Sequence, residues 1–214
     1  MSDHDHGHRH GHGHHGHGDR PRDRHGNPED HDHYLEKLLD PERAAWQKPD
    51  EVVAALGLAP GAVACDVGAG PGVFALRLAA AVGPSGRVHA IDVDPRMTAL
   101  LSERARLAGV SNLTVHLAPD GRGLPPEPVD ALLVVNTFHH FPEPVAYLRE
   151  LAARLAPGGR LVNVDFHGWE TPVGPPADHR VSREVFLEAA AAAGLAVKEE
   201  WTFLPYQYFL ALGR

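Results

Sequence analysis

The sequence predicts an α/β protein built around a doubly wound, mostly parallel sheet. Two observations support this fold class. Patterns typical of strands and helices alternate along residues 62–193, and two further strand patterns follow them. Parallel neighbours need helical crossovers, so the alternation predicts helices on both faces of the sheet. Ligands of such sheets bind at the carboxyl ends of the strands, near the switch in strand order. Residues that directly follow strands are therefore the functional candidates.

Apolar spacing and turn residues define the expected elements. The spacing of Tyr34, Leu35, Leu38 and Leu39 predicts a short amphipathic helix, and a second helix is expected over 50–56. The expected strands are 62–67, 88–93, 113–117, 129–135, 161–166, 195–203 and 206–212. The expected helices between them are 73–82, 97–107, 145–155 and 185–193.

Glycine, proline and capping residues set the ends of these helices. Asp94-Pro95 is a typical N-cap followed by a first helical residue, and Ser182 is the expected cap of the last helix. Gly109 and Gly194 are expected to close their helices, and the 157–159 turn is expected to stop the helix that ends at Leu155.

The amino-terminal segment differs from the rest of the chain. Residues 1–33 contain 11 of the 17 histidines and almost no large apolar side chain, so they predict a disordered tail. We divide the chain into this tail, a helical segment over 34–60 and a folded domain over 61–214. Histidine-rich tracts can bind Zn or Ni, here without a catalytic role. The candidate tail ligands are His4, His6, His8, His10, His12, His14, His15 and His17.

Composition excludes several classes of protein. A single cysteine, Cys65, permits neither an intrachain disulfide nor a cysteine zinc cluster. The sequence has no apolar run of about 18 residues and no signal-peptide pattern, so a cytoplasmic protein without a membrane span is expected. A formal net charge of −8 without a Lys/Arg run argues against nucleic-acid binding. Oligomeric state is not defined by the sequence.

A glycine loop follows the first expected strand and leads into a helix. It reads Asp66-Val67-Gly68-Ala69-Gly70-Pro71-Gly72, and Asp92 at the end of the second strand lies 20 residues beyond Gly72. Glycines let a ligand approach the backbone, and a helix N-terminus supplies amide donors. The spacing is G-x-G-x-G and not the dinucleotide pattern G-x-G-x-x-G. With a carboxylate positioned for ribose hydroxyls, the loop predicts a nucleoside pocket without a pyrophosphate cradle.

These motifs resemble those of the class I S-adenosylmethionine-dependent methyltransferases. The resemblance covers roughly residues 49–214 and includes Asn136 and the 155–161 run, Leu-Ala-Pro-Gly-Gly-Arg-Leu. It is greatest to the small-molecule branch, the ubiquinone/menaquinone-type or type 11-like methyltransferases. It implies a Rossmann-like methyltransferase fold, a seven-stranded sheet with an antiparallel last strand. It also implies S-adenosylmethionine as cofactor and a small-molecule methyl acceptor.

The resemblance also implies roles for individual residues. The glycine loop would lie against the methionyl end of the cofactor, Asp66 would orient its amino group, and Asp92 would hold the ribose hydroxyls. Val93 would lie against the adenine, Asp120 would accept from the adenine amino group, and Asn136 would lie near the methyl donor. For Asp120, an ordinary turn with Gly121 is the alternative. The implied cofactor-binding residues are Asp66, Gly68, Ala69, Gly70, Gly72, Asp92, Val93, Asp120 and Asn136.

Two clusters are candidates for the methyl acceptor. His139 and His140 follow the fourth strand, where a neutral imidazole could act as a base, and a structural role is the alternative. His179 and Arg180 lie in the irregular segment after the fifth strand, which is suited to a substrate lid. They could contact an acidic or phenolic substrate, or Arg180 could only hold the loop in place. The other histidines of the domain do not have metal-ligand spacing, so no catalytic metal is expected.

Methyl transfer to a small molecule is the favoured function. A nicotinamide-dependent oxidoreductase on a similar sheet is one alternative, disfavoured by the glycine spacing. A metal-handling protein that uses the histidine tail is another. The atom that accepts the methyl group is not defined by the sequence.

Overall fold

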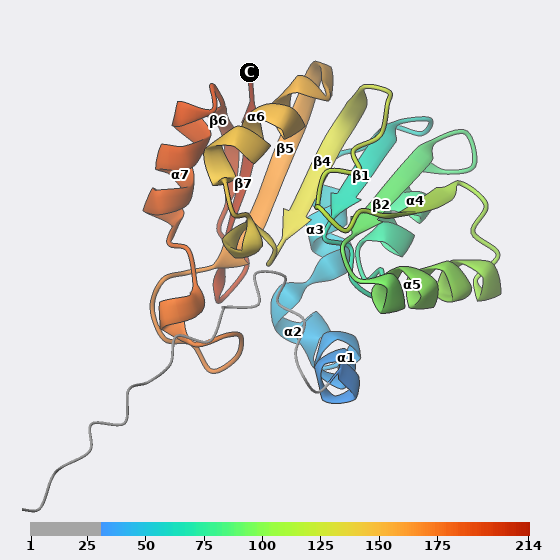
Figure 1. Cartoon of the computed structure of the whole chain (residues 1–214), viewed down its shortest axis with the longest axis horizontal. Coiled ribbons are helices and arrows are strands. Elements are labelled where there is room, and N and C mark those ends of the chain that lie inside the picture. Colours follow the sequence, from blue (N-terminus) through green and yellow to red (C-terminus); the bar gives the residue numbers. More distant parts are fainter. Residues whose placement is uncertain (1–30) are drawn as a thin grey trace, which may run out of the picture.

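The structure is a computed structural model that describes residues 31–214 as a seven-stranded sheet covered by helices (Figure 1). The strands are β1 (Val63–Val67), β2 (Arg87–Asp92), β3 (Leu113–Leu117), β4 (Val129–Val135), β5 (Leu155–Phe166), β6 (Ala196–Trp201) and β7 (Gln207–Gly213). The helices are α1 (His31–Leu39), α2 (Arg43–Gln47), α3 (Pro49–Ala55), α4 (Ala75–Val82), α5 (Pro95–Leu107), α6 (Pro144–Ala153) and α7 (Arg183–Ala192). Two short 3-10 helices are η1 (Phe138–His140) and η2 (Ala177–His179).

The strand order is β3-β2-β1-β4-β5-β7-β6. Neighbours among β1 to β5 pair in parallel, whereas β7 is antiparallel to both β5 and β6. The predicted fold class, including an antiparallel last strand, is confirmed. The chain order reverses between β1 and β4, so the switch point lies where these two strands end.

Two apolar layers cover the sheet. Helices α3 and α4 pack their apolar side chains on one face, with Leu78 and Phe209 fully buried there. Helices α6 and α7 cover the other face, where Leu151 and Phe186 are buried. Strand β4 is buried on both faces, because the successive residues Leu132 and Leu133 are both buried and belong to opposite layers. Its nearly continuous apolar sequence therefore matches its central place.

The predicted helix caps at Asp94 and Ser182 are confirmed. The Asp94 side chain accepts a hydrogen bond from the Arg96 amide at 2.8 Å, and Pro95 is the first residue of α5. The Ser182 hydroxyl accepts from the Val185 amide at 3.4 Å at the start of α7. Both side chains satisfy amides that a helix start leaves without intrahelical partners.

Two expectations about the elements need correction, and one helix was not predicted. The helix expected to reach Leu155 ends at Ala153, because Leu155 pairs with Val129 and begins β5. Helix α1 begins at His31, inside the segment predicted as a tail. Helix α2 was not predicted, since five residues are too few to show a helical period.

The carboxyl ends of the parallel strands meet at one end of the molecule. Helices α1 and α2 and the chain between β5 and α7 also lie at that end (Figure 1). Segments far apart in the sequence therefore surround the edge at which the candidate residues lie. Between residues 31 and 214, no helix is long and apolar enough to cross a bilayer.

Candidate cofactor and acceptor site

The glycine loop connects β1 to α4 with an unusual backbone. Gly68, Gly70 and Gly72 have φ values of 73°, 52° and 83°, in the left-handed region that favours glycine. A Cβ on Gly68 would overlap the side chain of Thr137, and one on Gly72 would overlap Leu101. These two glycines are therefore needed for the packing of the loop itself.

Gly70 differs from its two neighbours. A Cβ at Gly70 would meet only Leu38 Cδ1 of α1, at 3.9 Å. The Gly70 amide donates to Asp92 Oδ2 at 2.7 Å, so the loop is attached to the end of β2. Open space on this glycine leaves its backbone approachable by a ligand.

Asp92 is half-buried at the end of β2, where it organises two backbone segments. Its Oδ2 holds the Gly70 amide, and its Oδ1 accepts from the Asp94 amide at 2.9 Å. Burial raises the pKa of Asp92, while its backbone hydrogen bonds act in the opposite direction. The half-buried Val93 follows directly, and the buried Ala69 lies in the glycine loop.

Asp66 is a buried carboxyl group with spare hydrogen-bonding capacity. It is 2% exposed, and its Oδ2 has no hydrogen-bond partner among the described residues. Burial, with the Asp92 carboxylate nearby, raises the pKa of Asp66 to about 7, and a hydrogen bond from the Ala75 amide opposes this. A buried polar atom without a partner is costly, so this oxygen is suited to receive a donor from a bound ligand.

Asn136 follows β4 and lies next to the switch point. Its φ of 51° is unusual for a residue other than glycine, and such outliers cluster at functional sites. Its Oδ1 accepts from Gln207 Nε2 at 2.7 Å, which ties this loop to β7. Gln207 is buried and its Oε1 has no partner among the residues described. Sequence reasoning did not identify Gln207, because only the folded sheet brings positions 136 and 207 together.

Asp120 lies in an exposed turn after β3. Its Oδ1 accepts from the Arg122 amide at 3.0 Å, and the Gly121 amide donates to the Ala118 carbonyl. This is the local hydrogen bonding of the ordinary turn considered as the alternative. Binding of adenine by Asp120 stays a prediction.

The two adjacent histidines have different surroundings. His139 Nδ1 lies 3.4 Å from Asp165 Oδ2, and the imidazole is 14% exposed. His140 is exposed, and its ring centroid lies 4.0 Å from that of His139. Asp165, which sequence reasoning gave no role, is 1% exposed at the end of β5. An acidic residue near a strand end was the only available signal.

Arg180 anchors the segment between β5 and α7. Its guanidinium donates to the carbonyl oxygens of residues 167, 169, 173 and 175 and lies over the ring of Phe166. These contacts match the alternative in which Arg180 holds the loop in place. His179 is exposed on η2. A role of either residue toward substrate stays a prediction.

The amino-terminal helices supply residues that were not assigned to the site. Burial raises the pKa of Tyr34 on α1, and the nearby carboxylates of Asp92 and Asp94 also raise it, against Arg43. Helix α1 therefore lies over the Asp92 end of the site, consistent with Leu38 beside Gly70. Trp46 on α2 packs against Phe166 with ring centroids 5.5 Å apart. The amphipathic pattern predicts α1 but does not show what it covers.

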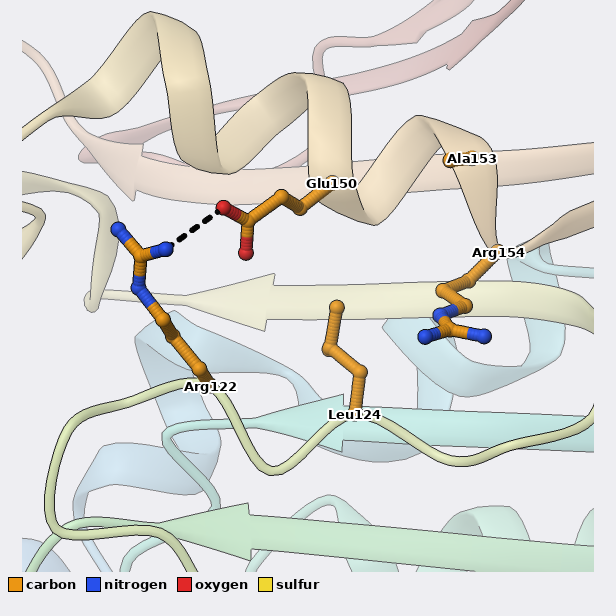
Figure 2. Close-up of a pocket in the computed structure, with 5 residues that line it drawn as sticks. All are labelled: Arg122, Leu124, Glu150, Ala153 and Arg154. Atoms are coloured by element: carbon orange, nitrogen blue, oxygen red, sulfur yellow. Dashed lines mark hydrogen bonds and ion pairs between the residues drawn. The ribbon is translucent and has the colours of Figure 1, made fainter.

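A surface pocket lies elsewhere on the molecule, and none of the candidate cofactor or acceptor residues lines it (Figure 2). It lies between α6 and the chain that precedes β4, and an ion pair between Arg122 and Glu150 crosses it. The eight histidines of the tail lie outside the described residues. Within residues 31–214, no group of three His, Cys, Asp or Glu side chains is placed to hold a metal ion.

The fold and this edge define a Rossmann-like domain with a site suited to a nucleoside-containing cofactor. Residues 64–159 match the family model described as "Methyltransferase domain". A crystal structure of a SAM-dependent methyltransferase from Aquifex aeolicus superposes with a TM-score of 0.77 at 29% identity. That similarity covers 84% of this chain and 96% of the other.

Two curated relatives are also similar. The 27-O-demethylrifamycin SV methyltransferase of Amycolatopsis mediterranei (strain S699) is 29% identical over 77% of this chain and 61% of its own length. A demethylmenaquinone methyltransferase of Anoxybacillus flavithermus (strain DSM 21510 / WK1) is 27% identical over 61% of this chain and 56% of its own. The chain thus spans between half and two thirds of these relatives. Together these matches show a methyltransferase domain that is similar in sequence and fold to S-adenosylmethionine-dependent methyltransferases.

Proposed function

We propose that this protein transfers a methyl group from S-adenosylmethionine to a small-molecule acceptor. The single observation that carries the proposal is the unpartnered, buried oxygen of Asp66 beneath a glycine loop that is attached to Asp92. This combination offers acceptors for an ammonium group and for ribose hydroxyls within one edge of the sheet. The names of the two curated relatives, which refer to small molecules, support the acceptor class.

The residues present fit the cofactor. Asp66 would accept from its amino group, which supplies the donor that Oδ2 lacks. Asp92 would accept from the ribose hydroxyls while keeping the Gly70 amide, since a carboxylate has about four acceptor sites. Gly70 would leave the backbone open to the methionyl end, and Gly68, Ala69 and Gly72 would give the loop the shape that this contact needs. Val93 and Asp120 are the proposed adenine neighbours, and Asn136 the proposed neighbour of the methyl donor.

When bound, S-adenosylmethionine supplies a sulfonium methyl group that is open to displacement by a nucleophile. The task of the chain is to align donor and acceptor and to exclude water. Helix α1, with Tyr34 near Asp92 and Leu38 beside Gly70, would cover the cofactor side. His139, His140, His179 and Arg180 are the proposed residues on the acceptor side.

Calorimetric titration of the full chain with S-adenosylhomocysteine, and separately with NAD, tests the proposal. We expect micromolar binding of S-adenosylhomocysteine and none of NAD. Binding of NAD alone would instead support an oxidoreductase, and binding of neither would overturn the proposed cofactor.

Binding of Zn or Ni by the tail is a separate proposal that rests on composition alone. Nuclear magnetic resonance signals of the tail histidines should shift when either metal is added to the full chain. Unchanged signals at equimolar metal would contradict it.

A further inference from the structure

One imidazole at the acceptor side is paired with a buried carboxylate. Asp165 is 1% exposed, and its Oδ1 accepts from the Phe166 amide at 2.8 Å, which fixes the carboxylate. Its Oδ2 lies 3.4 Å from His139 Nδ1, within reach of a hydrogen bond. Catalytic hydrogen bonds are often long in structures without ligands, and they shorten when the complex forms.

The His139 loop also contacts the glycine loop. Thr137, two residues before His139, packs so tightly against Gly68 that no side chain fits there. Strand β4 lies between β1 and β5, so the loop that follows it extends from the glycine loop to Asp165. His139 is therefore placed between the proposed cofactor loop and the end of β5.

The hydrogen bond to Asp165 selects one form of the imidazole. A carboxylate can only accept, so the proton of a neutral His139 must be on Nδ1. Nε2 then has a free lone pair, and it has no hydrogen-bond partner among residues 31–214. A buried acid that fixes the tautomer is the arrangement by which an imidazole is prepared to take a proton through Nε2.

We propose that His139 is a general base for the acceptor, that Asp165 is its positioning residue, and that the acceptor is a phenolic or enolic hydroxyl. The proposal rests on the proposed methyl transfer. As the acceptor oxygen forms a bond to the methyl carbon, its proton passes to His139 Nε2. The carbon–sulfur bond breaks and leaves its electron pair on sulfur, which becomes a neutral thioether. The imidazolium formed is stabilised by the Asp165 carboxylate.

The basicity of the imidazole limits which classes of hydroxyl group it can deprotonate. A neutral imidazole is a moderate base, so it takes a proton effectively only from a hydroxyl that is already fairly acidic. Phenols, with pKa values of about 10 by analogy with tyrosine, meet this condition, whereas aliphatic alcohols are far weaker acids. An amine that is already neutral needs no base in this position.

The decisive measurement is the tautomer of His139, read from the 15N shifts of histidine-labelled full-length protein above pH 8. We expect a proton on Nδ1 and none on Nε2 in the wild type, and a mixture in Asp165→Asn. His139→Gln assigns the signal, and Asp178→Asn, which changes an exposed acid, is the matched control and should leave it unchanged. A wild-type proton on Nε2 would overturn the proposal without any variant.

The acceptor class is tested with catechol and 4-nitrophenol against aniline and thiophenol, using S-adenosylmethionine as donor. We expect methylation of a hydroxyl probe that falls at least tenfold in His139→Gln and Asp165→Asn. Methylation confined to the amine or thiol, or of no hydroxyl probe, would overturn the acceptor assignment. Calorimetry with S-adenosylhomocysteine separates a failure of the proposed function from a failure of the inference about His139. If the wild type does not bind S-adenosylhomocysteine, the proposed function is overturned and the tautomer result still stands.

Discussion

The two halves of the site are built from different kinds of contact. Around β1 and β2, the site consists of backbone in left-handed conformation and two carboxylates, all within residues 66–92. Around β4 and β5, it consists of side-chain pairs from distant segments, such as Asn136 with Gln207 and His139 with Asp165. The first half depends on local backbone geometry, whereas the second depends on the register of strands β4, β5 and β7.

On the proposed function, this difference separates the residues that would bind the cofactor from those that would select the acceptor. The geometry of the glycine loop and its two carboxylates changes little unless a glycine or an acidic residue is replaced. Side-chain pairs across strands can be exchanged without altering the sheet, so one fold can serve many acceptors. Variants in the first half should therefore affect cofactor affinity, and variants in the second should leave it unchanged.

The largest effect is expected at Asp66. The pKa of Asp66 is raised to about 7, above its unfolded value, so its contribution to stability is present at low pH and is lost as pH rises through 7. Asp66→Asn should therefore raise the free energy of unfolding at pH 8 by up to about 4 kcal/mol, at about 1.4 kcal/mol per pH unit. Urea unfolding of both proteins from pH 4 to pH 8 measures the difference.

The same variant should weaken S-adenosylhomocysteine binding, because the amide cannot become a carboxylate opposite an ammonium group. Wild-type affinity should increase as pH rises through 7, and this slope should vanish in Asp66→Asn. Asp165→Asn is the control from the other half of the site and should retain the wild-type slope. A pH-independent wild-type affinity would argue against an ionisable Asp66 at the cofactor.

Gly70→Val should abolish most cofactor binding, with a loss of more than about a hundredfold, or about 2.7 kcal/mol. The new side chain would occupy the open face of the loop, where it meets only Leu38. Gly109→Val is the matched control, since Gly109 has a φ of 66° and open space but lies far from the loop in sequence. Both variants should lose a similar 1–2 kcal/mol of stability from backbone strain, and only Gly70→Val should lose binding in calorimetry.

Asp92→Ala should weaken S-adenosylhomocysteine binding by about 1.5–3 kcal/mol, the range for a lost hydrogen bond to a charged group. Asp130 provides a control, because its Oδ2 also accepts a backbone amide, that of Val63 at 2.8 Å. Asp130→Ala should cost some stability and leave the calorimetric affinity as it is. Equal affinities of Asp92→Ala and the wild type would remove Asp92 from the site.

The fold and the glycine loop could be predicted because their signals are local, whereas the role of the loop toward a cofactor stays a prediction. Strands β3 and β4 have the predicted bounds, and the glycine loop with Asp92 is visible as a short motif. Leu155 was assigned to a helix because its pairing with Val129 depends on a strand 26 residues away. Asp165 and Gln207 carry no local pattern, and their partners are defined only by the folded sheet. The position of Tyr34 near Asp92 could not be predicted, because it depends on how α1 packs against the rest of the domain.

The smallest effect is expected at Arg180. Its two alternative roles, holding the loop in place and contacting the substrate, predict different results for its replacement. If its four carbonyl contacts and its stacking on Phe166 only hold the loop, Arg180→Ala should lower the free energy of unfolding by about 1–2 kcal/mol and change S-adenosylhomocysteine affinity less than twofold. Arg149→Ala is the matched control, because the Arg149 guanidinium donates to one carbonyl, that of Ala192, from an exposed position. In urea unfolding, Arg149→Ala should lower the free energy of unfolding clearly less than Arg180→Ala does. Equal stability of the Arg180 variant and the wild type, with methylation of the phenolic probe reduced, would instead place the guanidinium at the acceptor. In that case the acceptor half would contain a charged contact for the substrate in addition to its paired histidine.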